Sequence, residues 1–318
     1  MSPVVRRRAY IAFIAISVIW GTTYLAIKLA LETIPPFTMG GLRYVIGGAI
    51  LALLLRARGV RLPPASAWPP FAVIGLLMLG FGNGGVTYAE QFVPSGLAAV
   101  MIATTPFWMT GVDALVGKGE RLGLRKFAGL AVGFAGIIVL VWPDLLASFS
   151  TGSRYGAGLI ALQLACVGWA FGSTYAKRLS QKADVLASAA MQMMFGGAWM
   201  LLAATMAGEW PRLHFNITTS ASLLYLILAG SVAGYAAYAY ALKHLPVSTV
   251  SMYAYINPVI AVALGTLLLG EPFHARMLVA AAIIAAGIMI VRMPTATAAG
   301  SEPIEVEAQT VVPVRRAG

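Results

Sequence analysis

The amino-acid sequence predicts an all-α membrane protein with ten transmembrane helices, arranged as two inverted five-helix repeats with both termini in the cytoplasm. Three observations support this: the composition, the side on which basic residues fall, and an internal duplication. Of the 318 residues, 59% are hydrophobic and only 10% are charged, whereas a soluble globular chain carries about a quarter charged residues. A soluble fold cannot hide this much apolar surface. The composition therefore excludes a soluble enzyme, a nucleic-acid-binding module and a secreted domain held by disulfides.

Each predicted helix is an apolar stretch close to the roughly 20 residues that cross the hydrocarbon layer. In chain order the ten stretches cover residues 9–31, 37–55, 69–90, 94–116, 124–142, 155–176, 184–207, 221–242, 246–269 and 274–293. The first follows three arginines, as in a signal peptide, but its length and the later spans favour an uncleaved helix. The segment 295–318 is rich in Ala, Thr, Pro and Glu, which predicts a disordered cytoplasmic tail.

The net charge of +11 is a topology signal. When the loops are placed alternately on the two sides of the membrane, seventeen Lys and Arg residues fall on the side of the N-terminus. Only Arg154, Arg212 and Arg276 fall on the other, outer side, while Lys28 and Arg43 lie within helices. Because basic residues resist translocation, the side with seventeen is predicted to be cytoplasmic. The basic excess does not indicate a nucleic-acid partner.

The chain repeats itself at an offset of about 151 residues. For example, the sequence WGTTY at Trp20–Tyr24 aligns with FGSTY at Phe171–Tyr175. Residues 1–147 and 148–294 are therefore predicted to be two copies of one unit. Because five helices is an odd number, the second copy must enter the membrane inverted. Such inverted repeats are typical of secondary transporters, in which the substrate site lies near the midplane between the halves.

A set of Gly, Pro, Trp and charged residues carries a resemblance to a known family. These residues are Trp20, Gly21, Lys28, Pro36, Arg43, Pro106, Gly119, Glu120, Gly129 and Gly136 in the first half, and Pro258, Gly270, Glu271 and Gly287 in the second. In them the chain resembles the drug/metabolite transporter superfamily, in its ten-helix branch of two EamA-type repeats. The resemblance covers residues 9–293 and implies export of metabolites. A narrower resemblance, carried by Tyr88, Trp108 and Trp169, is to the YddG-type aromatic amino acid exporter branch.

Aromatic side chains are the predicted substrate contacts. A Tyr or Trp ring offers a flat apolar face and one hydrogen-bonding group, which suits an amphipathic guest such as an aromatic amino acid. The candidate residues are Tyr88, Trp108, Trp169, Tyr235, Tyr238, Tyr253 and Asn257. Tyr253 and Asn257 share one helix face. The alternative is an interfacial aromatic belt, which suits Tyr88 near a helix end better than the deeper Trp108 and Trp169.

Two prolines, Pro106 and Pro258, are predicted near the middle of equivalent helices in the two halves. A proline has no N–H to donate, so it frees a carbonyl one turn earlier, at Ile102 and Ala254 respectively. Within a membrane that carbonyl needs a partner. The kinks are predicted to shape the cavity and to permit bending, and the alternative is that they serve packing alone.

The charged residues Lys28, Arg43 and Glu90 fall toward the outer ends of the first three helices. They either snorkel or pair with one another, and an outer gate formed by Arg43 and Glu90 is the sharper hypothesis. Because no carboxylate or histidine is placed at midplane, no proton relay is visible, and uncoupled transport is at least as well supported as proton antiport. Glu120 and Glu271 each precede a helix and are predicted to cap it or to hold a loop lysine.

The sequence favours a multi-pass inner-membrane exporter of small amphipathic metabolites, with aromatic or other large neutral amino acids as the first expected substrates. The expected mechanism is alternating access around a central aromatic-lined cavity. The alternatives are an exporter of drugs or other metabolites, a channel-like pore, and an intramembrane enzyme. The enzyme is the weakest, because neither a zinc-ligand motif nor a nucleophile turn occurs. We expect the lipid bilayer and a small-molecule substrate as partners, and no cofactor, metal, nucleic acid or obligate protein partner.

Overall fold

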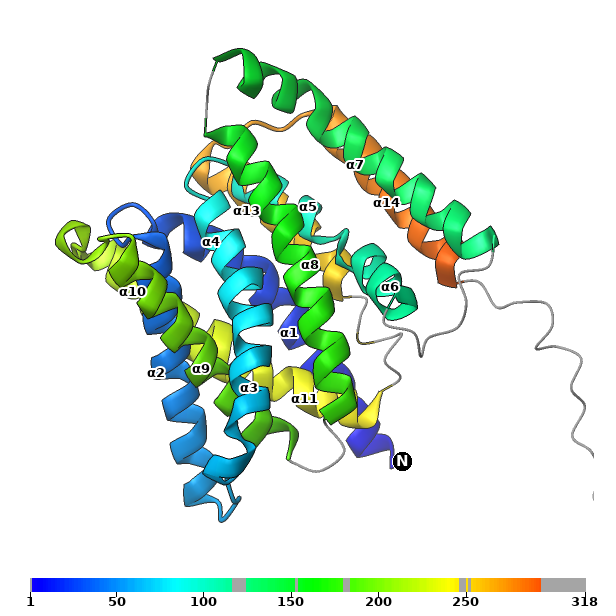
Figure 1. Cartoon of the computed structure of the whole chain (residues 1–318). Coiled ribbons are helices and arrows are strands. Elements are labelled where there is room, and N and C mark those ends of the chain that lie inside the picture. The colour runs from blue at the N-terminus through cyan, green and yellow to red at the C-terminus, as the bar shows by residue number, and fades with distance from the viewer. Residues whose placement is uncertain are drawn as a thin grey trace, which may run out of the picture.

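The computed structural model describes residues 2–115, 124–151, 154–179, 184–245, 250 and 253–292. All regular structure within these ranges is helical, as predicted (Figure 1). The helices are α1 (Pro3–Ala30), α2 (Pro36–Ala57), η1 (Ala65–Ala67), α3 (Trp68–Gly75), η2 (Leu76–Asn83), α4 (Gly84–Ala89), α5 (Ser95–Ile102), α6 (Thr105–Leu115), α7 (Leu124–Thr151), α8 (Tyr155–Leu179), α9 (Val185–Met206), η3 (Trp210–Arg212), α10 (Ile217–Tyr225), η4 (Leu226–Ala233), α11 (Gly234–His244), α13 (Tyr253–Leu269) and α14 (Ala275–Arg292). The predicted tail, 295–318, lies outside the described residues.

Among the described residues, six helical stretches are long and apolar enough to cross a membrane, and four shorter apolar helices complete the series. They follow the order of the ten predicted spans. The ends differ in places: α1 begins at Pro3 rather than at residue 9, because the Ser2 hydroxyl accepts a hydrogen bond from the Val5 amide and Pro3 starts the first turn. Helix α7 continues to Thr151, beyond the predicted end at residue 142.

The third and eighth spans each contain a π-helical segment, at the same place in the two repeats. In the third span η2 lies between α3 and α4, and in the eighth η4 lies between α10 and α11. A π turn replaces the usual hydrogen-bond spacing and often occurs at functional sites. Segment η2 packs on α8 of the second half, and η4 packs on α1 of the first half. The apolar periodicity of the sequence predicted the spans but not this local geometry.

The fourth span is broken rather than kinked. Helix α5 ends at Ile102 and α6 begins at Thr105, so Pro106 is the second residue of a new helix and not a mid-helix proline as predicted. Pro106 has no N–H to donate to the carbonyl oxygen of Ile102. That oxygen instead accepts a hydrogen bond of 2.6 Å from the Thr105 hydroxyl. Pro258, in contrast, lies inside α13 as predicted.

The two halves are intertwined, since the closest helix pairs join one half to the other. Helix α2 packs on α9, α7 on α14, and α5 on α13. Likewise α1 packs on α11 and α13, while α6 packs on α8. Figure 1 shows α7 and α14 running side by side at one edge of the bundle. Equivalent helices therefore meet each other across the interface, as expected for two copies of one unit.

Glycines allow several of these helix pairs to approach closely. At Gly287 in α14, an added Cβ would lie 2.7 Å from the carbonyl oxygen of Gly129 and 2.7 Å from the amide nitrogen of Gly133 in α7. Both neighbours are backbone atoms that cannot rotate away. This contact is the close backbone approach that small residues permit in membrane proteins.

We expect Gly287→Ala to lower the free energy of unfolding by about 1–3 kcal/mol, because α14 must move away from α7 to make room. Thermal unfolding of the purified protein in detergent measures this change. The matched control is Gly111→Ala in α6, where nothing lies within 4 Å of an added Cβ. Equal melting temperatures for the two variants would contradict the assigned packing.

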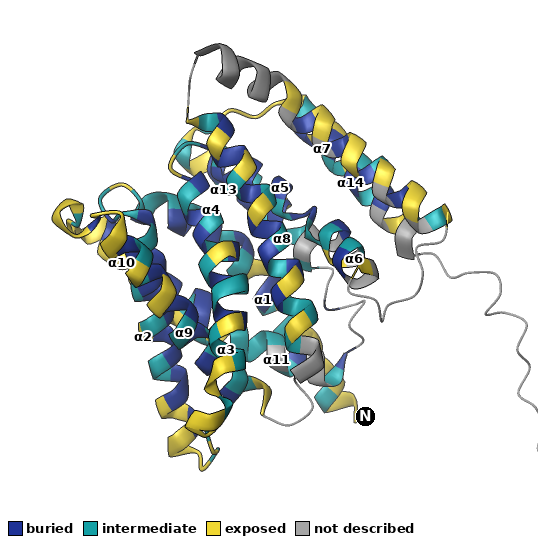
Figure 2. Cartoon of the chain, viewed as in Figure 1, coloured by how far each residue is buried: buried dark blue, intermediate teal, exposed yellow. Residues whose placement is uncertain are grey.

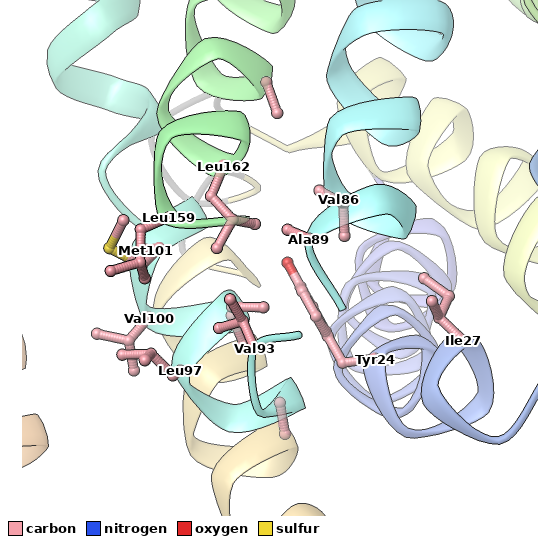
Figure 3. Packing of buried hydrophobic residues seen from close by; sticks show 14 of the residues in the cluster. Tyr24, Ile27, Val86, Ala89, Val93, Leu97, Val100, Met101, Leu159 and Leu162 are labelled. Carbon is pink, nitrogen blue, oxygen red and sulfur yellow. The ribbon is translucent and has the colours of Figure 1, made fainter. Parts of the chain in front are cut away.

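Buried residues lie mainly where helices face one another, and exposed residues lie on the outside of the bundle (Figure 2); many of the exposed residues are large and apolar. The largest buried cluster includes Tyr24 and Ile27 of α1, Val86 of α4, and Leu159 and Leu162 of α8 (Figure 3). On the outside, residues such as Leu53, Leu164, Val259 and Leu278 are more than half exposed. This is the distribution of a helix bundle whose outer surface faces lipid tails rather than water.

Candidate functional site

Four aromatic side chains form one cluster between the two halves, here called the aromatic cluster: Trp20, Tyr235, Tyr238 and Tyr253. The Trp20 ring lies 5.6, 5.4 and 4.9 Å, centroid to centroid, from the rings of Tyr235, Tyr238 and Tyr253 respectively. Tyr238 and Tyr253 also meet edge to face at 6.0 Å. Trp20 comes from α1 in the first half, and the three tyrosines come from α11 and α13 in the second.

The π-helical segment η4 positions Trp20. The indole N–H of Trp20 donates a hydrogen bond of 3.1 Å to the carbonyl oxygen of Gly230 in η4. One turn later, an added Cβ at Gly234 would lie 2.5 Å from the indole nitrogen. The indole ring therefore occupies this position because the π segment supplies a backbone acceptor and the following helix has a glycine, Gly234, beside the ring.

Asn257 joins α13 to α1 beside the aromatic cluster. With its amide oriented by the surrounding acceptors, the Asn257 nitrogen donates hydrogen bonds of 3.0 Å each to the carbonyl oxygens of Tyr253 and Ser17. Its side chain is 7% exposed. Asn257 thus fixes the register of the two helices that carry Trp20 and Tyr253.

The other predicted substrate contacts lie elsewhere. The Trp108 indole N–H donates a hydrogen bond of 2.9 Å to the side-chain oxygen of Gln163 in α8. The ring of Tyr88 meets those of Phe37 and Phe92. Trp169 faces η2, where an added Cβ at Gly82 would lie 3.2 Å from its ring. Of the predicted set, the structure therefore brings together Tyr235, Tyr238, Tyr253 and Asn257.

The sequence reasoning did not propose Trp20 and Gln163 as site residues. The sequence does mark Trp20, because this residue opens the duplicated WGTTY segment, but the mark indicates the family pattern and not a substrate contact. Gln163 has no such mark, since a single glutamine in an apolar span has no periodic partner. Its side-chain oxygen also lies 3.4 Å from the Thr104 hydroxyl, beside the break between α5 and α6.

The basic residues of the outer half bond to neutral groups. The Lys28 ammonium donates to the carbonyl oxygens of Glu90, at 2.6 Å, and Val93, at 3.2 Å. The Arg43 Nε donates to the Ser231 hydroxyl at 3.0 Å, and its guanidinium lies 4.8 Å from the centroid of the Tyr44 ring. Both carboxylate oxygens of Glu90 are buried without a hydrogen-bond partner. The predicted Arg43–Glu90 pair is not formed in this conformation, so the gate stays a prediction.

Two glutamates of the second half cap helices of the first half at the outer side, and we call these contacts the outer clamps. The Glu209 carboxylate accepts from the Thr38 amide at 2.7 Å and from the Thr38 hydroxyl at 2.9 Å, at the start of α2. The Glu271 carboxylate accepts from the Ser95 amide at 2.8 Å and from the Ser95 hydroxyl at 2.9 Å, at the start of α5. Negative charge is favourable at a helix N-terminus.

The capping prediction for Glu271 was therefore wrong about the partner. We expected it to cap the helix that follows it, which is α14, or to hold a loop lysine, whereas it caps α5 across the interface. The physical reason is tertiary, since the packing of the two halves brings the free amides of Ser95 and Gly96 at the start of α5 within 2.8 and 3.1 Å of the carboxylate. The equivalent residue Glu120 lies outside the described residues. Within the described ranges, no group of three or more His, Cys, Asp or Glu side chains could hold a metal ion.

A bundle of apolar spans in two equivalent halves, with aromatic and charged groups held between them, defines a membrane transporter of small molecules. The chain belongs to the EamA-like transporter family, whose model matches residues 7–142 and 156–293. The location is the inner membrane, which the protein crosses several times.

Curated relatives agree with this assignment. The chain is 37% identical to the "uncharacterized inner membrane transporter YedA" of Escherichia coli K12, over 89% of this chain and 90% of that protein. It is 27% identical to a "probable amino-acid metabolite efflux pump" of Salmonella typhimurium, over 90% of this chain and 94% of that protein. A solved crystal structure shares the fold, with a TM-score of 0.62 and 23% identity over 90% of this chain and 97% of that one.

Proposed function

We propose that this transporter exports aromatic and other large neutral amino acids, as the YddG-type branch does, and that the aromatic cluster is part of the substrate site. The cluster carries the proposal, because it gathers rings from both halves into one place. Tyr and Trp rings suit a guest that has a flat apolar side chain and polar ends. The similarity to a protein described as a probable amino-acid metabolite efflux pump supports the same substrate class.

The polar groups around the cluster would hold the ends of such a guest. Arg43, which is 4% exposed, lies beside Gly230, where an added Cβ would be 3.0 Å from a guanidinium nitrogen and whose carbonyl accepts the Trp20 hydrogen bond. A guanidinium is a good partner for a carboxylate, so Arg43 is the residue that we assign to the α-carboxylate of the substrate. Its bond to the neutral Ser231 hydroxyl leaves the positive charge without a bonded carboxylate in this conformation.

We propose alternating access as the mechanism, with residues 1–147 and 148–294 as the moving halves. The outer clamps hold the outer ends of α2 and α5 against the second half, which corresponds to a state closed to the outside. Release of the clamps would open that side. Pro258 would allow α13 to change direction, since it cannot complete the regular helical bonding there, and the break before Pro106 would let α6 turn relative to α5. Trp108 and Trp169 would line the path on the first-half side of α8.

Transport of this kind has no catalytic step, and we assign the chain no enzymatic activity, cofactor or obligate protein partner. What it requires is a substrate gradient or a coupled ion. The binding energy of the substrate acts on the relative stability of the two open states, as in any ligand-driven population shift.

Counterflow in proteoliposomes tests the proposal. Vesicles preloaded with unlabelled phenylalanine receive labelled phenylalanine outside, and lysine serves as the charged comparison. We expect saturable accumulation of phenylalanine and none of lysine. If folded protein accumulates none of phenylalanine, tryptophan and leucine, this substrate class is excluded. Flux that never saturates would indicate a pore rather than a carrier.

A further inference from the structure

Glu90 is the most deeply buried carboxylate among those whose side chains the structure describes. It follows α4 at the outer end of the third span, and its exposed fraction is 0%. Neither carboxylate oxygen has a hydrogen-bond partner. Burying an ionised carboxylate without a partner is very costly, so such a group is expected to be neutral. A neutral carboxyl has a bound proton, so the proton is a ligand of the protein at this position.

Charged and polar groups surround Glu90 without bonding its carboxyl. Lys28 from α1, Arg43 from α2 and Glu271 after α13 all act on it electrostatically, and so does the Tyr24 side chain. Lys28 donates instead to the backbone carbonyl of Glu90. Figure 3 shows the Tyr24 ring directed from α1 toward the end of α4 at Ala89. On the remaining side α8 presents Gly158, which packs against the backbone of Ala89.

The other carboxylates whose side chains the structure describes differ from Glu90 in this respect. Glu32 is exposed to solvent. Asp184 is also exposed and caps the start of α9, where it accepts from two backbone amides. Glu209 and Glu271 each accept several hydrogen bonds in the outer clamps. All four have water or donors to stabilise a negative charge, and Glu90 alone among the described side chains has neither.

We propose that Glu90 is a proton-binding site, and that the conformation closed to the outside requires Glu90 to carry its proton. Opening of the outer side would admit water to the carboxyl. The proton then passes from the carboxyl oxygen to water, and the carboxylate that remains can pair with Lys28 or Arg43. The only bonds that change are the two O–H bonds of this transfer. Reclosing requires the proton to return.

This site goes beyond the proposed function, because it names a proton as a second ligand of the transporter. The protonation rests on the burial of Glu90 and on the lack of a hydrogen-bond partner for its carboxyl oxygens. Its link to opening rests on the proposed alternating access, but not on the identity of the substrate. An experiment without substrate can therefore test it separately.

Infrared difference spectroscopy tests the protonation. The purified protein is titrated across neutral pH, and the C=O stretch of a protonated carboxyl is compared between wild type, Glu90→Gln and the exposed control Glu32→Gln. We expect the band in wild type and in the control, and its loss in Glu90→Gln. A second measurement uses wild-type protein that contains glutamate labelled with carbon-13. The same band must shift in this protein, so the test does not depend on whether the Gln variant folds. The absence of the band, or its persistence in well-folded Glu90→Gln, would overturn the proposal.

Labelling at the outer side tests the link to opening. Ile34 is fully buried on that side, and Ile34→Cys in a Cys166→Ser background gives a single reporter thiol. The rate of labelling by a maleimide is measured at several external pH values, with and without Glu90→Gln, which corrects for ionisation of the thiol itself. The labelling rate of the protein that keeps Glu90 is divided by the rate of the Glu90→Gln variant at the same pH. We expect this ratio to rise with pH, by at most about tenfold per pH unit for one linked proton. A ratio that does not change with pH would exclude the link.

Discussion

Trp20→Ala is expected to reduce the rate of phenylalanine counterflow by at least about tenfold. The substitution removes three ring–ring contacts, and such contacts contribute about 0.5–1.5 kcal/mol each beyond burial. It also removes the hydrogen bond to the Gly230 carbonyl, which contributes about 1 kcal/mol. Since about 1.4 kcal/mol corresponds to a factor of ten, loss of part of this sum already produces the expected effect. The measurement is the initial rate of labelled uptake at a fixed amount of folded protein.

Two further variants separate the causes. Trp20→Phe keeps an aromatic ring but loses the N–H donor, so we expect it to retain most of the activity if ring contacts dominate. Trp142→Ala is the matched control, because the Trp142 side chain on α7 is 54% exposed and is not part of the aromatic cluster. Equal losses in Trp20→Ala and Trp142→Ala would show that the aromatic cluster has no special role in transport.

Glu209→Ala is expected to shift the protein toward the state open to the outside by about tenfold or more. Hydrogen bonds to a charged group contribute about 1.5–3 kcal/mol each, and the Glu209 carboxylate accepts two short ones from Thr38. The start of α2 would lose its cap from the second half. The measurement is the rate of maleimide labelling at Ile34→Cys, in the Cys166→Ser background, which should rise by a similar factor.

Glu271→Ala should act in the same direction through α5, and the double variant should exceed either single one. Glu32→Ala is the control, because this exposed carboxylate lies on the same side and has no part in the outer clamps. If the clamps serve only general stability, Glu209→Ala would lower the melting temperature without raising the labelling rate. That result would refute their assignment to the outer gate.

The sequence predicted the helical fold and its family because these depend on averages over long segments. Apolar length, basic-residue asymmetry and the duplicated WGTTY segment each involve many residues, so local exceptions do not alter them. Pro106 shows where such reasoning ends. The proline predicted a kink inside a continuous fourth span, whereas the structure has a break in which α6 begins three residues after α5 ends. The Thr105 hydroxyl bonds the Ile102 carbonyl and stabilises that break.

The candidate site was predicted in part, for a similar reason. Tyr235, Tyr238, Tyr253 and Asn257 were identified from residue type and helix face, and they do lie together. Their partner Trp20 comes from the other half of the chain, and no spacing along the sequence reports that proximity.

The sequence by itself determined the environment of the protein, its order of spans and its repeated design, since hydrophobicity and charge act on each segment independently of its neighbours. Only the tertiary structure decided which polar groups are paired. It bonded Glu271 to α5 instead of α14, separated Arg43 from the Glu90 carboxylate, and left that carboxylate buried without a donor. Hydrogen bonds form over a few ångströms, and distances of that size between distant segments are set only when the two halves pack.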